Sequence, residues 1–313
     1  MKEMLIAVVV LVAGFVLLIK GADFFVDGSS SVAKRLRVPS MIIGLTIVAM
    51  GTSLPECAVS VTASISNNNA LAVSNAVGSN IFNLMVVCGV CALFAPLAVS
   101  RDTLKKEFPF SVICAIVLMA FGYMGMELGR IEGIIMLAIF AAYLGYMIYS
   151  ALKARSQADD EEYKILPVWK CILFIAGGAA AIKFGGDFVV KGATVIASGF
   201  GLSQNLIGLT IVALGTSLPE LVTSVVAAKK NEVDMAVGNV IGSNIFNILL
   251  VLGVAATISP VAFIMENVVD IIVLIVMSVI VWAMAWSNNK IIRSEGAVMV
   301  LMYAAYMVYI CIR

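Results

Sequence analysis

Thirteen residues, Gly44–Glu56, occur a second time at Gly208–Glu220, and the copies differ only at Met50 against Leu214. The shift between them is 164 residues. Two further pairs of segments follow the same shift: Asn75–Asn83 with Asn239–Asn247, and Gly21–Gly28 with Gly185–Gly192. Three segments in one register indicate a duplication that covers nearly the whole chain, so the fold must be built from two related halves.

The composition is that of a membrane protein. The 313 residues are 62% hydrophobic and 12% charged, which lies outside the range of soluble globular domains. A helix needs about 20 apolar residues to cross a hydrocarbon core of roughly 30 Å. Runs of this kind cover residues 4–33, 39–66, 71–95, 108–126, 130–152, 167–198, 203–228, 234–258, 266–287 and 291–312. They lack the alternation of barrel strands, so we expect an all-α transmembrane fold of ten helices.

Each half of the duplication holds five predicted helices. The first half covers residues 1–152 and the second 167–313, and the polar segment 153–166 joins them as a cytoplasmic linker. Because five is an odd number, the second half enters the membrane from the opposite face. The sequence therefore predicts two inverted-topology repeats related by an axis in the membrane plane.

The basic residues predict the orientation. Lys2, Arg130 and Arg313 are the Lys and Arg residues expected at one face of the membrane. Fourteen of the 20 lie at the loops of the other face, namely Lys34, Arg35, Arg37, Arg101, Lys105, Lys106, Lys153, Arg155, Lys164, Lys170, Lys229, Lys230, Lys290 and Arg293. By the positive-inside rule the linker is cytoplasmic and both termini are outside.

Glu56 and Glu220 carry the strongest functional signal. Glu56 is the only charged residue in 38–100, and Glu220 is the only one in 192–228. A carboxylate inside a bilayer costs at least about 2.5 kcal/mol, so it must face a cavity, pair with another group or be protonated. A neutral Glu that merely bonds two helices would not explain two copies in the same context. These residues are therefore predicted to form one cation site.

The residue before each glutamate is a proline, which lacks an N–H group. Pro55 leaves the Gly51 carbonyl without its helical donor, and Pro219 does the same at Gly215. We expect each helix to break beside its glutamate. Freed backbone carbonyls are tolerated at membrane depth where they line a cavity or bind an ion, and four hydroxyls add oxygens there: Thr52, Ser53, Thr216 and Ser217.

A second polar set lies on the third and eighth predicted helices. Ser79 and Asn83 are four residues apart and share a helical face, as do Ser243 and Asn247. They could serve only to join helices, or they could be ligands. All these candidates offer oxygen, and the chain has no His, so a hard cation such as Ca²⁺ or Na⁺ is favoured over Zn²⁺ or Cu⁺.

Several other residues receive no primary role. Asp23 and Asp187 occupy matched positions and could cap, pair or attract ions to the entrance. Cys88 and Cys91 have the spacing of a metal or redox pair, but on an apolar helix they are predicted to be packing residues. We expect no cofactor, no enzymatic activity, no nucleic acid and no obligate protein partner. The expected location is the cell membrane, with the lipid bilayer as surroundings.

The repeated motifs resemble a known family. Gly51–Glu56, Gly215–Glu220 and the two Gly-Ser-Asn-Ile-Phe-Asn segments look like the α-repeats of the sodium/calcium exchangers, within the cation/calcium exchanger superfamily. The resemblance covers both repeats in order and implies a prokaryotic-type antiporter with ten helices. It implies that the first and sixth helices slide across the other eight, giving alternating access to one site.

The resemblance also implies a ligand set. Ca²⁺ would be held by the carboxylates of Glu56 and Glu220 together with the backbone carbonyls of Thr52 and Thr216. Na⁺ would compete for the same place and use further groups: the carbonyls of Ala49 and Ala213 and the side chains of Ser53, Ser79, Ser217 and Ser243. Archaeal members can carry Asp at the position of Asn247, whereas here both Asn83 and Asn247 are neutral amides.

The neutral amides leave two central carboxylates. Two negative charges balance one Ca²⁺ or two Na⁺, and a third Na⁺ would leave an uncompensated positive charge. Three alternatives to Na⁺/Ca²⁺ exchange stay open: coupling to H⁺, dependence on K⁺, and a cation channel with Glu and Ser oxygens in its filter. Broken helices in an inverted duplication fit alternating access better than a channel.

Overall fold

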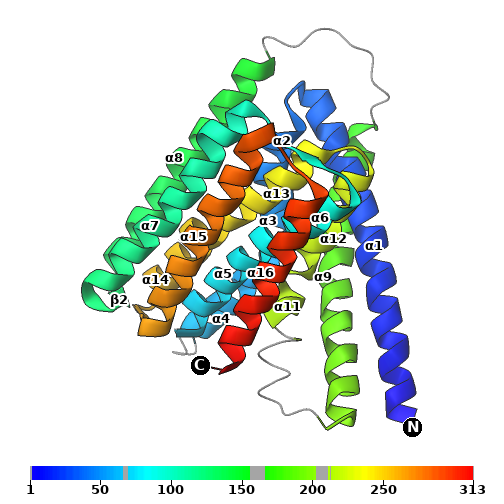
Figure 1. The fold of residues 1–313 in the computed structure, drawn as a ribbon. Coiled ribbons are helices and arrows are strands. Elements are labelled where there is room, and N and C mark those ends of the chain that lie inside the picture. Colours follow the sequence, from blue (N-terminus) through cyan, green and yellow to red (C-terminus); the bar gives the residue numbers. More distant parts are fainter. Residues whose placement is uncertain (1, 66–69, 156–165, 202–210, 212, 313) are drawn as a thin grey trace.

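The computed structural model describes residues 2–65, 70–155, 166–201, 211 and 213–312. The described part is almost entirely helical (Figure 1). The helices of the first half are α1 (Lys2–Leu36), α2 (Ser40–Ile43), α3 (Ala49–Thr52), α4 (Leu54–Ile65), α5 (Ala70–Phe82), α6 (Cys88–Phe94), α7 (Phe108–Gly125) and α8 (Arg130–Arg155). Those of the second half are α9 (Val168–Gly199), α11 (Ala213–Thr216), α12 (Leu218–Lys229), α13 (Val233–Phe246), α14 (Gly253–Ile258), α15 (Met265–Asn288) and α16 (Arg293–Ile312).

Wider π-helical turns connect some of these segments into longer spans. They are η1 (Gly44–Val48), η2 (Asn83–Val87), η3 (Thr103–Glu107) and η5 (Asn247–Leu252). η2 begins at Asn83 and η5 begins at Asn247, the last residues of the repeated Asn motif. π-helical turns are rare and often accompany functional sites, and no feature of our sequence analysis predicted them.

The membrane-spanning prediction agrees with the helices over most of the chain. In the described residues, eight helices are long and apolar enough to cross a membrane, and the bent pair Ser40–Thr52 and Leu54–Ile65 makes up to nine. The predicted span 203–228 includes residues 202–210 and 212, which lie outside the described part; α11 and α12 follow them. The count of ten therefore remains a prediction.

One helix start was predicted wrongly. The predicted span 108–126 begins at Thr103 in the structure, so Lys105 and Lys106 belong to the helical span rather than to a loop. The Ser100 hydroxyl accepts the Thr103 backbone N–H at 3.1 Å, which satisfies one of the free donors of a helix start. A local side-chain cap outweighs the charges in setting this boundary.

α1 and α9 pack against each other in antiparallel directions along their lengths (Figure 1). A Cβ atom at Gly14 would lie 2.9 Å from the carbonyl oxygen of Gly185, and one at Gly21 would lie 3.0 Å from that of Gly178. Only glycine permits this separation. Gly14 and Gly178 are counterparts in the repeat, as are Gly21 and Gly185, so the two contacts are the same contact seen from each half.

The other helices surround α5 and α13. α13 is buried at every residue from Met235 to its end at Phe246, and polar residues on it and on α5 point into the protein interior. Two short antiparallel ladders join the halves near the helix ends: β1 (Leu97–Ala98) with β4 (Lys290–Ile291), and β2 (Glu127–Leu128) with β3 (Val261–Ala262).

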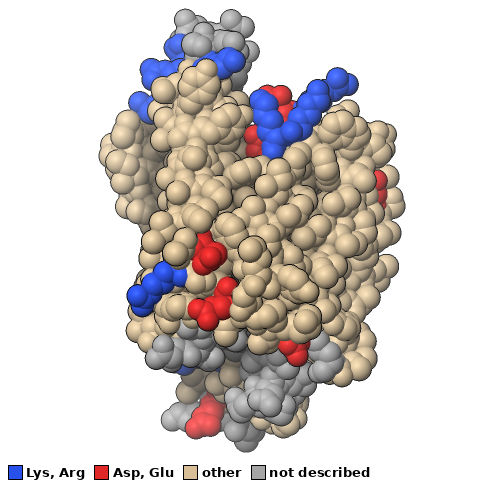
Figure 2. All heavy atoms as spheres, turned by 90° about the vertical axis from the view of Figure 1, so that its left-hand side faces the viewer, with Lys and Arg blue, Asp and Glu red and all other residues tan. Residues whose placement is uncertain are grey.

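The two ends of the helical bundle differ in charge. In Figure 1 the two termini lie at one end, and α8 finishes at the opposite end. Figure 2 views the molecule from the left-hand side of Figure 1. Most of the Lys and Arg side chains visible there are gathered at the end where α8 finishes. On this face the basic residues lie as the sequence predicted.

Candidate ion-binding site

The helix that carries Glu56 is broken next to the glutamate, as predicted. α3 ends at Thr52, Ser53 leaves helical geometry with φ −84° and ψ 8°, and the two segments meet at an angle of 49°. The second half repeats this geometry at Ser217, with φ −95° and ψ 6°. Pro55 and Pro219 lie two residues beyond each break, where the missing N–H removes a helical bond.

Each carboxylate is held by a serine of the other half. Ser53 donates to Glu220 Oε1 at 2.9 Å, and Ser217 donates to Glu56 Oε1 at 3.1 Å. Both glutamates are fully buried. The two bonds are counterparts under the 164-residue shift, so the two broken helices meet at one place and exchange the same contact.

Ser79 belongs to the same cluster, because its hydroxyl lies 3.0 Å from the Ser217 hydroxyl. It is buried on α5. Ser217 therefore connects Glu56 of the first broken helix to Ser79 of the neighbouring helix. The structure thus brings together the two carboxylates and three of the predicted serines.

Five oxygens of predicted site residues are buried and have no hydrogen-bond partner in the described structure. They are Glu56 Oε2, Glu220 Oε2, Asn83 Oδ1, Asn247 Oδ1 and Ser243 Oγ. A buried polar atom without a partner costs roughly 1–3 kcal/mol, and native proteins contain few of them. Carboxylate, amide and hydroxyl oxygens are the ligand atoms that hard cations bind. Here five such oxygens lie in one set of repeated motifs.

Four asparagines fix the two central helices to each other. Asn80 Nδ2 donates to the Asn244 carbonyl at 3.0 Å, and Asn244 Nδ2 donates to the Asn80 carbonyl at 3.2 Å. Asn83 Nδ2 donates to Asn244 Oδ1 at 3.3 Å, and Asn247 Nδ2 donates to Asn80 Oδ1 at 3.1 Å. With their nitrogens engaged in this way, Asn83 and Asn247 keep their Oδ1 atoms free.

Asn75 and Asn239 are positioning residues that the sequence analysis left without a role. Asn239 donates to the Ser224 hydroxyl at 2.9 Å and lies 3.5 Å from the Glu220 carbonyl, and Asn75 makes the matching contacts at 3.1 and 3.4 Å. Their place at the first position of the repeated Asn motif was the available signal. Asn80 and Asn244, inside the same motif, were missed in the same way.

The predicted threonine and alanine ligands differ in the hydrogen bonds that they already form. The Thr52 hydroxyl lies 3.1 Å from Asn239 Oδ1 and 3.2 Å from the Val48 carbonyl, so this hydroxyl already has partners. The Ala49 carbonyl accepts the Ser53 N–H at 3.0 Å. Ala213 and Thr216 are the first and last residues of α11.

A cavity of about 340 Å³ reaches the second broken helix. Pro55, Gly215, Thr216, Pro219 and Asp187 are among its lining residues. Thr216 is partly exposed, whereas its counterpart Thr52 is fully buried. The cavity therefore approaches the site from the side of Thr216.

On the α1 side, Phe25 fills the space next to the first break. A Cβ atom at Gly51 would lie 2.6 Å from Phe25 Cζ, and Phe25 is only 1% exposed. Lys230 lies 2.7 Å from Asp27 Oδ1 and 3.1 Å from Asp23 Oδ1, so α1 is attached to the turn after α12. On this side the first break is therefore covered by Phe25, and α1 is held beside it by ion pairs.

Asp23 and Asp187, to which the sequence assigned no primary role, both form ion pairs. Asp187 lies 2.7 Å from Lys183 on its own helix, and Asp23 binds Lys230. Cys88 and Cys91 are buried free thiols among apolar residues. The described residues contain no group of three or more His, Cys, Asp or Glu side chains close enough to hold a metal.

The chain is similar to known proteins over nearly its full length. A family model described as sodium/calcium exchanger protein matches residues 6–149 and 170–312. The putative antiporter CaxA of Alkalimonas amylolytica is 45% identical, covering 82% of each chain. The sodium/calcium exchanger MaX1 of Methanosarcina acetivorans is 32% identical, covering 96% of this chain and 97% of its own.

A solved structure resembles the fold closely. It is that of the sodium-calcium exchanger NCX_Mj soaked with Na⁺ and Sr²⁺, with a TM-score of 0.86 and 31% identity. The match covers 97% of this chain and 98% of that one. The similarity therefore extends over both halves of the duplication.

Proposed function

The chain belongs to the sodium/calcium exchanger family, and from this premise we propose that it exchanges Ca²⁺ for Na⁺ across the cell membrane by alternating access to one central site. As a member of this family it is a multi-pass membrane transporter of the cation/calcium antiporter type.

The observation that carries the proposal is the set of five buried, unpartnered oxygens on Glu56, Glu220, Asn83, Asn247 and Ser243. Two carboxylates, two amides and a hydroxyl are the donor types that Ca²⁺ and Na⁺ take in proteins. Leaving them without partners costs free energy in the empty protein, and a bound cation offsets that cost. A soft metal finds no suitable ligand among them.

We assign the ligands as follows. Ca²⁺ is bound by the carboxylates of Glu56 and Glu220 and by the backbone carbonyls of Thr52 and Thr216. Na⁺ uses the same carboxylates and additional oxygens from Ala49, Ala213, Ser53, Ser79, Ser217 and Ser243, with Asn83 and Asn247 beside them. Because two carboxylates balance one Ca²⁺ or two Na⁺, the ions exclude each other, and this competition couples their transport.

Alternating access is supported by the paired contacts of the two halves. Ser53 with Glu220 and Ser217 with Glu56 are the same bond made twice, and α1 packs antiparallel to its counterpart α9. These features favour inverted repeats, and the distribution of the basic residues favours an arrangement with both termini outside. In that arrangement the cavity beside Thr216 opens to the exterior, while Phe25 and the Lys230 ion pairs close the cytoplasmic side.

The test is ion exchange in proteoliposomes. Vesicles loaded with Na⁺ and diluted into Na⁺-free medium with radioactive calcium should accumulate Ca²⁺ above the outside concentration while the membrane potential is clamped. A channel cannot do this without an electrical driving force. Separate K⁺ and pH gradients identify the coupling ion, and accumulation driven by a pH gradient but not by Na⁺ would overturn the assignment of Na⁺.

A further inference from the structure

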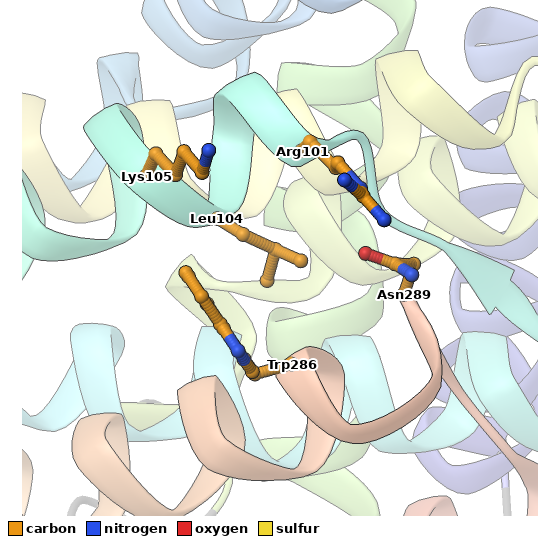
Figure 3. Close-up of a pocket in the computed structure, with 5 residues that line it drawn as sticks. All are labelled: Arg101, Leu104, Lys105, Trp286 and Asn289. Carbon is orange, nitrogen blue, oxygen red and sulfur yellow. The ribbon is translucent and has the colours of Figure 1, made fainter.

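A cleft away from the ion site lies between the start of η3 and the end of α15 (Figure 3). It has a volume of about 280 Å³ and is lined by Arg101, Leu104, Lys105, Trp286 and Asn289. In Figure 3 the Leu104 and Trp286 side chains point toward each other, and the Arg101 guanidinium extends toward Asn289. An apolar floor therefore lies beside two cationic side chains.

The walls of this cleft are joined by hydrogen bonds that leave the lining side chains free. The Trp282 indole N–H donates to the Leu104 carbonyl at 2.8 Å, which ties α15 to η3. The Val99 N–H donates to the Asn289 carbonyl at 2.9 Å, next to the β1–β4 ladder. The shape of the cleft is thus set by the protein and does not depend on a ligand.

The two cations of the cleft have no acidic partner. Across the described residues, neither Arg101 nor Lys105 forms an ion pair or a side-chain hydrogen bond. Lys106, the next residue, lies 3.3 Å from Asp102, although it does not line the cleft. The positive charge of the cleft is therefore uncompensated.

The matching place in the other half is uncharged, although its backbone is the same. Asn289 and its counterpart Met126 both adopt the left-handed conformation, with φ 51° and φ 50°. At the 164-residue shift the counterparts of Arg101 and Lys105 are Met265 and Val269. Counted back three residues from the left-handed residue of each half, Tyr123 stands where Trp286 does. The same backbone therefore forms without cationic residues at this position. This indicates that Arg101 and Lys105 have a role other than maintaining the fold.

The cleft lies where the spanning helices end. The spans Thr103–Gly125 and Met265–Asn288 begin and end at it, which puts it at the level of lipid headgroups. Ile272, Val276 and Val279 are exposed on α15 at helical spacings that lead to Trp286. An acyl chain lying along this face would bring its headgroup to Arg101 and Lys105.

We propose that this cleft binds the phosphate headgroup of an anionic phospholipid, with Arg101 and Lys105 as its cationic contacts and Trp286 beside the glycerol and upper acyl chain. Basic pockets between membrane helices at the cytoplasmic side recognise such headgroups. The site is independent of the ion site, and its occupant is neither Ca²⁺ nor Na⁺. A free phosphate ion would gain nothing from the apolar face of α15.

The test measures lipid binding to the full-length protein by native mass spectrometry. Dioleoylphosphatidylglycerol and dioleoylphosphatidylcholine are titrated onto delipidated protein. Wild type should prefer phosphatidylglycerol, and Arg101→Gln with Lys105→Gln should weaken its binding about 25-fold, since each cation near a membrane surface contributes about fivefold. The control, Lys106→Gln with Arg155→Gln, removes the same charge from the same end and should leave binding unchanged.

A second measurement does not depend on the folding of the double variant. In nanodiscs, brominated phosphatidylglycerol should quench the fluorescence of wild type more than brominated phosphatidylcholine does, and Trp286→Phe should remove the difference. Equal binding by both double variants, or equal quenching by both lipids, would overturn the proposal. Displacement of phosphatidylglycerol by millimolar inorganic phosphate would assign the cleft to free anions instead.

Discussion

The α1–α9 pair and the central helices α5 and α13 are built for different purposes. In their most apolar stretches, 72% of the α5 span and 78% of the α13 span are buried in the protein, against 22% in α1 and 28% in α9. α5 and α13 are joined by reciprocal asparagine bonds. α1 and α9 mainly contact each other and expose large apolar side chains.

This difference separates ligand placement from movement. In the proposed mechanism, the serine ligands of α5 and α13 lie on helices locked to each other by hydrogen bonds, where a displacement breaks several bonds at once. The α1–α9 pair is tightly joined within itself, and its contacts with the core include one packed aromatic ring and a few ion pairs. We therefore expect the pair to move as a unit while the core stays fixed.

The largest effect is expected when one carboxylate of the proposed ion site is removed. Glu56→Gln or Glu220→Gln should lower Na⁺-dependent Ca²⁺ uptake by at least about a hundredfold, because each removes half of the fixed charge that binds the cation. Uptake of radioactive calcium into Na⁺-loaded proteoliposomes measures it. Glu107→Gln changes a buried carboxylate outside the site and should retain exchange; wild-type activity in both site variants would refute the central claim.

The next prediction tests whether close packing of α1 against α9 stabilises the protein. A Cβ atom at Gly178 would lie 2.8 Å from the Gly21 carbonyl, so Gly178→Leu should separate the helices and cost about 1–3 kcal/mol of stability. Thermal unfolding in detergent measures the loss. Gly177→Leu is the matched control, because nothing lies within 4 Å of its Cβ. Equal melting temperatures for the two variants would mean that close packing of the pair is dispensable.

A third prediction concerns the charge of the core. Asn247→Asp adds a third carboxylate to the proposed site, which should change Na⁺ affinity roughly tenfold more than Ca²⁺ affinity, or should change the number of charges moved per cycle. Flux measured at several membrane potentials separates the two. If both ions respond equally, the charge count does not limit the number of Na⁺ ions bound.

The smallest effect is expected where the pair meets the core. Lys230→Gln removes the partly exposed ion pairs with Asp23 and Asp27, and such pairs contribute about 0.2–1 kcal/mol. The closed side should open more often, by a factor of roughly two to five. The measure is the labelling rate of Ser29→Cys, a buried position on α1, in protein whose Cys57 and Cys311 are replaced by Ser.

The matched control is Lys183→Gln, which removes the other short ion pair on the α1–α9 unit, within α9 itself. It should leave the labelling of Ser29→Cys unchanged, because that pair does not connect the unit to the core. Unchanged labelling in Lys230→Gln as well would show that the ion pairs of Lys230 do not keep this side closed.

Part of the site could be predicted because its signals are local. An isolated glutamate, a proline one residue before it and a repeat at constant shift are all visible along the chain, and the break at Ser53 and the burial of both glutamates agree with them. The start of η3 was missed because a single serine cap moved it by five residues. The π-helical turns at Asn83 and Asn247 have no local pattern that we recognise.

The sequence by itself determined the duplication, the membrane-spanning character and the two carboxylates, since periodicity, hydropathy and repetition are properties of neighbouring residues. The tertiary structure decided which partners these residues meet. Ser53 bonds Glu220 rather than the glutamate three residues away, and Asn80 bonds Asn244 across the interface of the halves. The physical reason is that such contacts join residues more than a hundred positions apart, and only the packing of α5 against α13 and of one broken helix against the other brings them within hydrogen-bond distance.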